Sequence, residues 1–284
     1  MPDAQKVNRV DLGNIEAINR VSGSNIEQLD GQGFVTFTAA TYTFNSTNNS
    51  WAVPGGTTHM DITVIGGGAR GWANQNYSGF GGGGSGASQS TENTGGRTAI
   101  GNITNLAIVI GAAGASWGAA GASTVNGNGL TEIAGNGGYM PDGAWTAYSW
   151  GGGPRASGGT GAGGNTSTNG GQGGYPRYGG GEGFAGNAGA CGGGGGGDAH
   201  TNTAGAAGGG GNIGGAGGAG GDGSYSNNNV PSWGADGVFP GGGGGGRGAG
   251  WGTRSGSPGS NNVDALGSAG RVVINTRSGS TGNT

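Results

Sequence analysis

Large aliphatic side chains are scarce in this chain of 284 residues. Leu, Ile, Val and Phe together number 36, about 13% of the sequence, which is below the roughly 20% at which a conventional hydrophobic core becomes doubtful. Charge is scarce as well, because charged residues make up 9% and the formal net charge is only −3. Disordered chains usually combine low hydrophobicity with high net charge. A large aliphatic core is therefore excluded, but charge repulsion will not keep the chain open.

Reactive residue types are also nearly absent. Cys191 is the only cysteine, so no intrachain disulfide can form. Lys6 is the only lysine, which excludes the phosphate-binding motif GxxxxGK[ST]. Cys191 and His200 could in principle form a nucleophile and base, but no rigid element is predicted to hold them, and a solvated loop histidine is favoured. The carboxylates have no metal-ligand spacing, so we predict no enzyme activity, no cofactor and no metal site.

Three features that would indicate a partner or a location are missing. The arginines are scattered rather than clustered, which argues against nucleic-acid binding. No apolar run approaches the roughly 18 residues that cross a bilayer. The first residues, MPDAQKVNRVDLGN, contain no apolar signal-peptide segment, so we expect synthesis as a soluble protein.

Glycine, by contrast, is abundant, with 82 residues in the chain and 46 of the 100 residues from Gly151 to Gly250. Glycine loses more conformational freedom on folding than any other residue, so a flexible linker and a disordered middle remain alternative interpretations. One stretch argues for order, because Ala216, Ala219 and Asp222 recur at every third position. A polyproline-II-type helix has three residues per turn. These three side chains would then share one edge and leave bare backbone on the other two.

Such a helix has no internal hydrogen bonds, so each N–H and C=O needs a partner in a neighbouring helix or in water. Glycine on the touching edges lets left-handed helices pack side by side through N–H···O=C bonds and weaker Cα–H···O contacts. Collagen also depends on glycine, but it requires a strict Gly-X-Y period and abundant proline, and this chain has only eight prolines. We therefore predict a polyglycine II bundle and exclude collagen.

The first 33 residues contain an internal repeat with an offset of eleven residues. Asn8-Arg9-Val10 and Asn14-Ile15-Glu16 return as Asn19-Arg20-Val21 and Asn25-Ile26-Glu27. Two copies are too few for a self-supporting solenoid, so we expect a segment that folds against a partner or against copies of itself, with a flexible leader as the alternative. The candidate attachment residues are its apolar positions Val10, Ile15, Ile18, Val21, Ile26 and Leu29.

Alternating apolar and polar residues predict β-strands that frame the glycine-rich stretches. The expected strands are 34–38, 41–44, 51–53, 60–65, 106–110 and 271–274. Residues 45–50 have turn chemistry, and 106–110 is expected to be buried on both faces because it is apolar throughout. The last strand is expected to close a small sheet with the N-terminal ones. The predicted organisation is an attachment segment (1–33), a glycine-rich domain (34–277) and a flexible tail (278–284).

The order of these segments carries a resemblance. Trp51-x-Val-Pro-Gly-Gly, Ile62-Thr-Val-Ile-Gly-Gly-Gly, Ala107-Ile-Val-Ile-Gly-Ala-Ala-Gly, the polyglycine runs and Gly270-Arg-Val-Val-Ile together look like the glycine-rich domain of many phage tail and fibre proteins, over about residues 33–277. The same order is similar to the glycine-rich ectodomain of the anaplastic lymphoma kinase family, which implies a jelly-roll-like sandwich with inserted polyglycine II helices. It also resembles the distal tail-fibre adhesins of T-even-type phages, whose variable loops recognise host receptors.

Two departures from these families matter. The kinase-family domain is an extracellular module with a signal peptide and several cysteines, which this chain does not match. The T-even adhesins begin with an attachment domain unlike residues 1–33. The fold expectation is therefore a mainly β protein with little or no helix, in which a small jelly-roll-like β-sandwich carries an inserted polyglycine II helix bundle.

Tyrosine and tryptophan are concentrated in the intervals between glycine runs. If the runs are stacked helices, these intervals are loops collected at the two ends of the bundle. Loops on a rigid scaffold often carry recognition, and Tyr and Trp among Asn, Ser and Gly have the composition of binding loops. The alternative is that the aromatics cap the bundle and supply buried apolar area. The receptor-binding candidates are Trp72, Tyr77, Trp117, Tyr139, Trp145, Tyr148, Trp150, Tyr175, Tyr178, Tyr225, Trp233 and Trp251.

These observations predict a bacteriophage virion protein at the receptor-binding tip of a tail fibre. The N-terminal segment would bind other virion proteins, and the aromatic loops would bind a host surface glycan or an outer-membrane protein. A homo-oligomer is compatible with the repeat, whereas nucleic acid is not an expected partner. Two alternatives stay open, namely a capsid-decorating or filament-forming protein without receptor binding, and a bacterial surface or matrix protein exported without a cleaved signal.

Overall fold

The structure is a computed structural model in which strands and extended segments account for the described part of the chain. It describes residues 17–18, 21–22, 28–29, 32–33, 39–55, 57–71, 82–93, 103–115, 118–127, 129–140, 156–174, 185–196, 205–220, 234–246 and 265–277. Sixteen strands and no helix occur among these residues, which confirms the predicted mainly β class. The expected strand 34–38 lies outside them.

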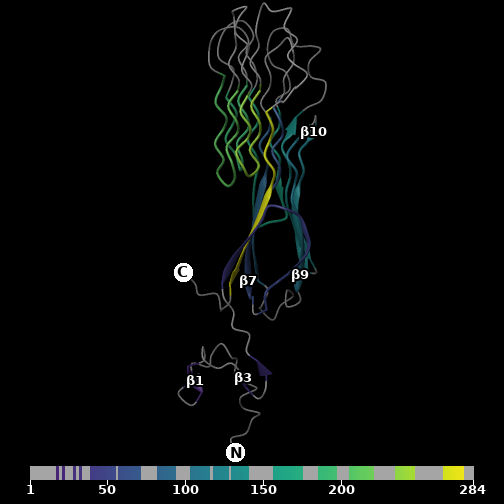
Figure 1. Ribbon diagram of the computed structural model, residues 1–284, viewed down its shortest axis with the longest axis vertical. Helices are drawn as coiled ribbons and strands as arrows, with labels where there is room; N and C mark the ends of the chain where they lie inside the picture. The colour runs from purple at the N-terminus through teal and green to yellow at the C-terminus, as the bar shows by residue number, and fades with distance from the viewer. Residues whose placement is uncertain are drawn as a thin grey trace, which may run out of the picture.

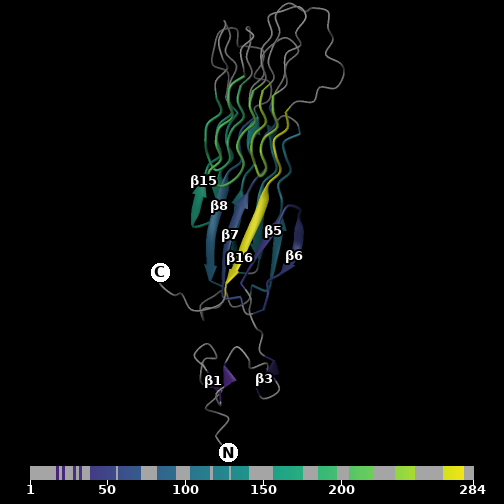
Figure 2. The same ribbon diagram turned by 60° about the vertical axis from the view of Figure 1, so that its left-hand side comes forward.

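Two five-stranded antiparallel sheets form the lower half of the glycine-rich domain (Figures 1 and 2). The first sheet, in spatial order, consists of β15 (Thr166–Thr168), β8 (Ala87–Asn93), β7 (His59–Ile65), β16 (Arg271–Arg277) and β5 (Ala40–Phe44). The second consists of β14 (Gly161–Ala162), β12 (Leu130–Gly135), β11 (Ser123–Gly127), β9 (Asn105–Val109) and β6 (Asn48–Ala52). A short pair, β10 (Gly118–Ala119) and β13 (Tyr139–Met140), lies above them.

The two sheets face each other across one hydrophobic core. Alternate residues of β7 and β16 are buried, and the facing strands of the second sheet bury their own alternate residues. The fully buried members are Met60, Ile62, Val64, Leu106, Ile108, Val125, Ile133, Val272 and Ile274. Because this period-two pattern places one face of each sheet inward, the small number of large aliphatic residues suffices for one compact β-sandwich.

The last strand closes the first sheet, as predicted. Ile274 in β16 pairs with Tyr42 in β5 on one side and with Ile62 in β7 on the other. The chain therefore returns to its own beginning after some 200 intervening residues. This pairing ties the two ends of the glycine-rich domain together.

Two details of the strand prediction were wrong. Residues 106–110 were expected to be buried on both faces, but β9 alternates, with Ile108 buried and Val109 39% exposed, because only one of its faces packs into the core between the described sheets. The expected turn at 45–50 is also too long, since β6 already begins at Asn48. Strands β8, β11 and β12 were not predicted, because β8 (ASQSTEN) is polar and the other two contain few apolar residues.

Extended glycine-rich segments continue from the strands and rise away from the sheets (Figure 1). Residues 66–71 continue β7, residues 82–86 lead into β8, and residues 265–270 lead into β16. Further segments between 185 and 246 run up and down beside them and turn back near the sheets. One of these turns contains the cis peptide Phe239–Pro240, followed by Gly241 with a φ of 78°.

Segment 191–196 has hydrogen bonds to six other segments, and the pattern repeats every three residues. Its N–H groups donate, in chain order from Gly192 to Gly195, to the carbonyl oxygens of Gly215 (3.0 Å), Asn187 (3.1 Å), Gly82 (2.8 Å) and Gly218 (2.9 Å). Its carbonyl oxygens, from Cys191 to Gly196, accept from the N–H groups of Gly171 (2.8 Å), Gly243 (3.0 Å), Gly209 (2.8 Å), Gly174 (2.7 Å), Gly246 (2.9 Å) and Ala206 (3.1 Å). Groups three residues apart thus bind the same neighbouring segment.

This packing explains where glycine is required. A Cβ atom on Gly192, Gly193 or Gly194 would meet the carbonyl oxygen of Gly209, Gln172 or Gly244 respectively, so a side chain would clash in each of three directions. Segment 214–220 lies at the edge of the bundle instead. There Gly215 and Gly218 are buried, whereas Ala216 is half-buried and Ala219 is exposed. The common edge predicted for these two alanines stays a prediction, because Gly217 between them is half-buried as well. Asp222 lies outside the described residues.

Two small hairpins precede the sandwich. The first pairs β1 (Ala17–Ile18) with β2 (Val21–Ser22), and the second pairs β3 (Gln28–Leu29) with β4 (Gln32–Gly33). The attachment candidates Ile18, Val21 and Leu29 fall on these strands. Val10, Ile15 and Ile26 lie outside the described residues.

Candidate recognition end of the glycine-rich bundle

Seven intervals of the chain separate the ends of neighbouring glycine-rich segments. They are 72–81, 116–117, 141–155, 175–184, 197–204, 221–233 and 247–264, and all lie outside the described residues. Eleven of the twelve predicted binding aromatics fall within them, namely Trp72, Tyr77, Trp117, Trp145, Tyr148, Trp150, Tyr175, Tyr178, Tyr225, Trp233 and Trp251. The described residues that flank these intervals show where each one leaves and re-enters the fold.

The flanking residues meet at one end of the bundle. Backbone hydrogen bonds join these residues to one another. In each bond the N–H group of the first residue donates to the carbonyl oxygen of the second: Gly71 to Ala265 (2.8 Å), Gly82 to Gly244 (2.7 Å), Gly246 to Gly195 (2.9 Å), Ala206 to Gly196 (3.1 Å), Gly220 to Ala206 (2.8 Å), Gly174 to Gly194 (2.7 Å) and Gly173 to Ala156 (3.0 Å). Gly114 joins the series through the carbonyl oxygen of Gly68 (2.9 Å). Figure 1 shows the coloured segments ending together, at the end opposite the sheets.

The sequence predicted that the aromatic intervals are loops at both ends of the bundle. The described residues that flank these intervals lie at one end only, so the prediction was wrong for the flanking residues. Each segment that leaves a strand starts at the sheets, so the sandwich already occupies the lower end of the bundle. The described turns at that end, such as the one at Phe239–Pro240, are tight. The described flanks of the seven intervals lie at the upper end.

The frame at this end is built from main-chain groups. Its hydrogen bonds run from N–H to C=O between segments, and Ala69, Met140 and Ala156 form the small buried apolar cluster there. Because backbone groups are the same for every residue type, the frame does not depend on the side chains in the intervals that it carries. It is a rigid support of the kind on which binding loops are usually placed.

Tyr139 is the one predicted binding residue whose surroundings the structure describes. It lies in β13 beside Ala119 of β10, and its N–H donates to the carbonyl oxygen of Ser157 (2.9 Å). Its side chain is 41% exposed, while the next residue, Met140, is buried. Backbone pairing thus holds a partly exposed phenol ring at the edge of this end, where it offers an aromatic face and a hydroxyl group.

Arg70 is a second functional group near this end, and sequence reasoning did not select it. Its Nη1 donates to the carbonyl oxygen of Ala115 (2.6 Å), so it links the segment before interval 72–81 to the segment before interval 116–117. Burial lowers the pKa of its guanidinium group, but an arginine in a protein stays protonated. The only sequence signal was its position two residues after the glycine run 66–68.

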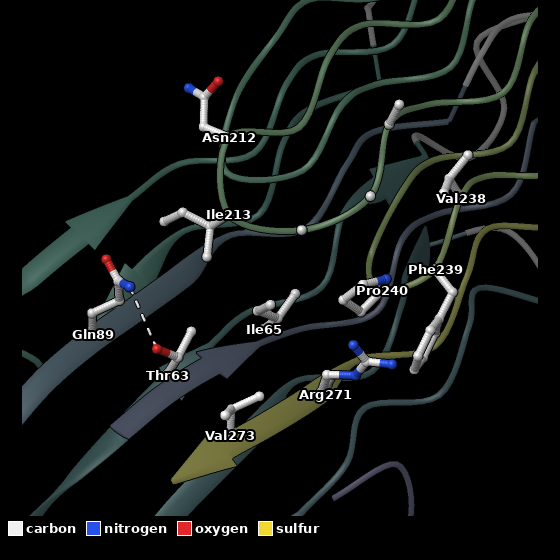
Figure 3. A pocket seen from close by; sticks show the side chains of 13 residues that line it. Thr63, Ile65, Gln89, Asn212, Ile213, Val238, Phe239, Pro240, Arg271 and Val273 are labelled. Atoms are coloured by element: carbon white, nitrogen blue, oxygen red, sulfur yellow. Dashed lines mark hydrogen bonds between the residues drawn. The ribbon is translucent and has the colours of Figure 1, made fainter. Parts of the chain in front are cut away.

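A groove lies on the outer face of the first sheet. Figure 3 shows it between β7, β8 and β16 and the turns of the glycine-rich segments. It has a volume of about 690 Å³ and is walled mainly by Ile65, Ile213, Pro240 and Val273. The Arg271 guanidinium lies 4.3 Å from the centre of the Phe239 ring, and its Nε donates to Asn45 Oδ1 (3.0 Å).

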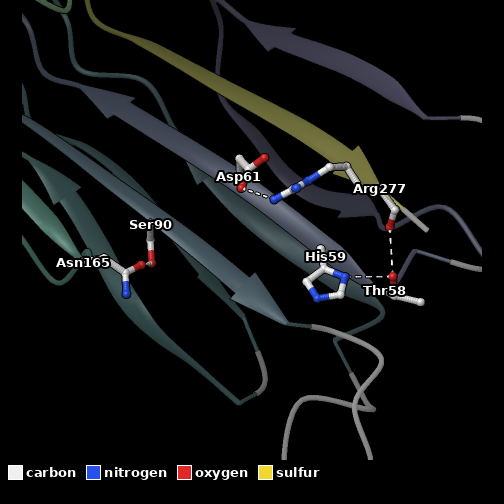
Figure 4. A network of polar contacts seen from close by, with 6 residues as sticks. All are labelled: Thr58, His59, Asp61, Ser90, Asn165 and Arg277. Carbon is white, nitrogen blue, oxygen red and sulfur yellow. Dashed lines mark hydrogen bonds and ion pairs between the residues drawn. The ribbon is translucent and has the colours of Figure 1, made fainter. Parts of the chain in front are cut away.

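Polar contacts along the lower part of the first sheet link its strands (Figure 4). Arg277 Nη2 lies 2.7 Å from Asp61 Oδ1 in an exposed ion pair, and Ser90 Oγ donates to Asn165 Oδ1 (2.6 Å). His59 Nδ1 lies 2.9 Å from Thr58 Oγ1, while its buried Nε2 has no hydrogen-bond partner among the described atoms. These pairs join neighbouring strands and loops.

Cys191 lies buried where the bundle meets the sandwich. Its Sγ accepts a hydrogen bond from Ser85 Oγ (3.1 Å) and donates one to the carbonyl oxygen of Pro240 (3.3 Å). Burial, the largest effect, raises the pKa of the thiol, and the hydrogen bond from Ser85 partly opposes it. His200, its proposed partner in the catalytic alternative, lies outside the described residues. A neutral, buried thiol is a packing group rather than a nucleophile.

Among the described residues, His, Cys, Asp and Glu do not gather in groups of three that could hold a metal ion. Nor does that part of the chain contain a helix capable of spanning a membrane.

Comparison with protein-family models found no match, and comparison with curated proteins found no significantly similar relative.

Proposed function

We propose that this chain is a bacteriophage virion protein, the receptor-binding tip of a tail fibre, and that the upper end of its bundle is the host-binding surface. The observation that carries the proposal is that the flanks of all seven intervals meet at one end. Eleven predicted binding aromatics thereby share anchorage on one frame, beside Tyr139. A host surface glycan or an outer-membrane protein is the proposed receptor.

The frame is, in this proposal, a polyglycine II helix bundle inserted into a jelly-roll-like sandwich. The three-residue period of the hydrogen bonds of segment 191–196 supports this assignment, because that helix has three residues per turn. Its six hydrogen-bonded neighbours support it as well, since left-handed glycine helices can pack against others on every side. A collagen-like arrangement would involve three chains around one axis.

Aromatic loops on such a frame suit receptor binding for two reasons. Tyr and Trp offer large, stiff contact areas at low entropic cost, and their flat faces stack on sugar rings. The frame uses main-chain hydrogen bonds, so the loops can change in sequence without loss of their support. The sandwich and the N-terminal segment then connect this end to other virion proteins, and the proposal assigns no catalytic step to the chain.

The test compares two aromatic residues of equal exposure in different places. Tyr139 is 41% exposed at the upper end, and Phe239 is 40% exposed beside the groove. Fluorescently labelled protein is titrated onto host cells and onto outer-membrane vesicles, with the variants Tyr139→Ala, Trp145→Ala/Trp150→Ala and Phe239→Ala. We expect the first two to weaken binding by about tenfold or more, on the order of 1.4 kcal/mol, and the third to leave it unchanged.

Immunogold electron microscopy of particles provides the independent readout of position. Gold at the far ends of tail fibres is expected. Gold over the capsid or along a shaft, together with unchanged cell binding by the Tyr139 and Trp145/Trp150 variants, would overturn the proposal.

A second candidate, an architectural protein that assembles side by side with its neighbours, is favoured by a different observation. Three exposed apolar residues lie on the flank of the bundle, namely Val238 (54% exposed), Phe239 (40%) and Leu266 (42%). Gly237 and Leu266 are joined by a backbone hydrogen bond of 2.9 Å, so these residues share one surface. Exposed apolar clusters commonly mark contact surfaces. If Phe239→Ala abolishes filaments or lateral arrays and Tyr139→Ala does not affect cell binding, this candidate replaces the first.

A further inference from the structure

Segment 234–240 on the flank of the bundle has one side turned to solvent along its whole length. Every third residue, namely Gly234, Gly237 and Pro240, is half-buried, and the pairs 235–236 and 238–239 between them are exposed. This is the period of an extended helix with three residues per turn. The solvent side of the segment therefore carries an acidic residue, Asp236, as well as Val238 and Phe239.

Asp236 and Arg271 lie at opposite ends of the exposed apolar residues. Oδ1 of Asp236 accepts a hydrogen bond from the N–H of Leu266 (2.7 Å), so this carboxylate sits level with Leu266. Arg271 comes five residues later, and its guanidinium lies 4.3 Å from the centre of the Phe239 ring (Figure 3). At about 3.1 Å per residue, roughly 15 Å of backbone separates the two levels. The two charges are thus too far apart to pair with each other.

Both charged groups are held in place and still have capacity to bind. Asp236 is fixed through Oδ1, and Arg271 is fixed through Nε, which donates to Asn45 Oδ1 (3.0 Å). Neither forms an ion pair with another described residue. Arg271 is also the only charged residue among those that line the adjoining groove. The flank therefore has an apolar centre with a negative charge above it and a positive charge below it.

Such a surface is complementary to itself when it is turned end over end. A two-fold contact brings residue i of one copy against residue j of the other, and j against i. If two copies meet antiparallel on this flank, Val238 and Phe239 of both lie at the centre, and each Asp236 faces Arg271 of the second copy. A parallel arrangement would place like charges opposite each other, which is unfavourable. A partner with charge of a single sign would match only one end of the flank.

We propose that two copies of this chain form an antiparallel, two-fold symmetric dimer through Val238, Phe239 and Leu266, with an Asp236–Arg271 ion pair on each side. The contact is closed, unlike the open side-by-side assembly considered above. Three apolar residues and two exposed ion pairs make a small contact, which belongs to the weak class of interfaces. We therefore expect it to dissociate at micromolar concentrations.

This dimer does not depend on the receptor-binding role. In the antiparallel arrangement the upper ends of the two copies point in opposite directions, so one cell surface can be bound by only one of them. Loss of the dimer would consequently leave binding to cells by a single upper end unchanged. The dimer and the receptor-binding role can each fail without the other.

The test is a charge swap in the full-length chain, with the mass in solution as the readout. Sedimentation velocity is measured from about 1 to about 100 µM, a range that brackets a micromolar Kd, for the wild type, Asp236→Arg and Arg271→Glu, and for an equal mixture of the two variants. Glu132→Arg is the matched control, because Glu132 is an exposed acid on the second sheet, away from this flank. Unfolding midpoints show whether each variant remains folded.

We expect the wild type and Glu132→Arg to reach twice the chain mass of 26.8 kDa and to stop there. Each variant alone places like charges at both ends of the contact, so its dimer should be at least about tenfold weaker. The mixture restores one native and one reversed ion pair, so it should recover most of the wild-type affinity. High salt should weaken the wild-type dimer, because exposed charges are screened.

Three results would overturn the proposal. The first is a wild type that stays monomeric at the highest concentration, which would leave this flank free or to a different protein. The second is a mass that keeps growing with concentration, because it would show open assembly instead of a two-fold contact. The third is a mixture that associates no better than the separate variants while all of them remain folded, because the Asp236–Arg271 pairing would then be absent.

Discussion

Adding one methyl group at the centre of the bundle should be severely destabilising. Gly194 is buried, and a Cβ atom there would collide with the carbonyl oxygen of Gly244, a backbone atom that can yield only if its whole segment moves. Gly210 provides the matched control, because it is exposed and a Cβ there would meet nothing within 4 Å. The substitutions Gly194→Ala and Gly210→Ala are chemically identical and lie in neighbouring parts of the same bundle.

The magnitude follows from the contacts of Gly194. Overpacking of a filled interior costs about 1–3 kcal/mol. Displacement of the segment would also strain two hydrogen bonds, from Gly194 N–H to Gly82 (2.8 Å) and from Gly174 N–H to Gly194 (2.7 Å), each worth about 0.5–1.5 kcal/mol. Gly194→Ala should therefore lower the free energy of unfolding by about 2–6 kcal/mol. Gly210→Ala should leave it unchanged or raise it by about 0.4–1 kcal/mol, because alanine restricts the unfolded chain.

Thermal and urea unfolding, followed by circular dichroism, measure both variants. For a chain of this size, 1 kcal/mol corresponds to roughly 2–4 °C in Tm, so Gly194→Ala should lower Tm by roughly 5–20 °C. If Gly194→Ala unfolds at the wild-type temperature, or if both variants lose the same stability, the close packing of segment 191–196 against its six neighbours is refuted.

Two further predictions concern the junction and the sandwich. Burial raises the pKa of the Cys191 thiol, so the folded protein holds the thiol proton more tightly than the unfolded chain does. The resulting contribution to the free energy of unfolding is present below the ordinary thiol pKa of about 8.5 and is lost as pH rises above it. The urea midpoint of the wild type should thus fall relative to that of Cys191→Ser above about pH 8.5, and parallel profiles would contradict this. In the sandwich, Ile274 is fully buried, so Ile274→Ala should cost about 2–5 kcal/mol and Ile274→Val about 0.5–1.5 kcal/mol; equal urea midpoints for the two variants would show that the core does not enclose this side chain.

Much of the architecture could be predicted from local pattern. Alternation in residues 60–65 identified β7, because a strand with one buried face must alternate. The β-branched residues of 271–274, directly after Gly270, identified β16. The three-residue spacing of Ala216 and Ala219 predicts a shared edge, and this stays a prediction, because Gly217 between them is half-buried as Ala216 is. A glycine run such as 192–196 has no side chain in any direction. The structure places this run where other backbone segments surround it, so that a Cβ atom on Gly192, Gly193 or Gly194 would meet a carbonyl oxygen.

The sequence was less informative where partners are chosen at a distance. Hydrogen bonds between glycine segments join groups that are identical at every residue, so nothing in residues 191–196 specifies which six segments surround them. Strand β8 was missed because its polar residues pair with β7 through the backbone, over the full length from His59 to Ile65. The groove and the Arg271–Phe239 contact were missed because their residues are far apart in the chain.

By itself, then, the sequence determined the mainly β class, the principal strands of the core and the segments that had to be glycine. Those properties follow from side-chain period and from the room that a Cβ atom needs, which are local. Only the tertiary structure decided that every aromatic interval is anchored at one end and that Gln28–Gly33 forms a hairpin as Ala17–Ser22 does. Both depend on which backbone N–H and C=O groups pair with each other. These groups are chemically the same in every residue, so the sequence does not specify their partners.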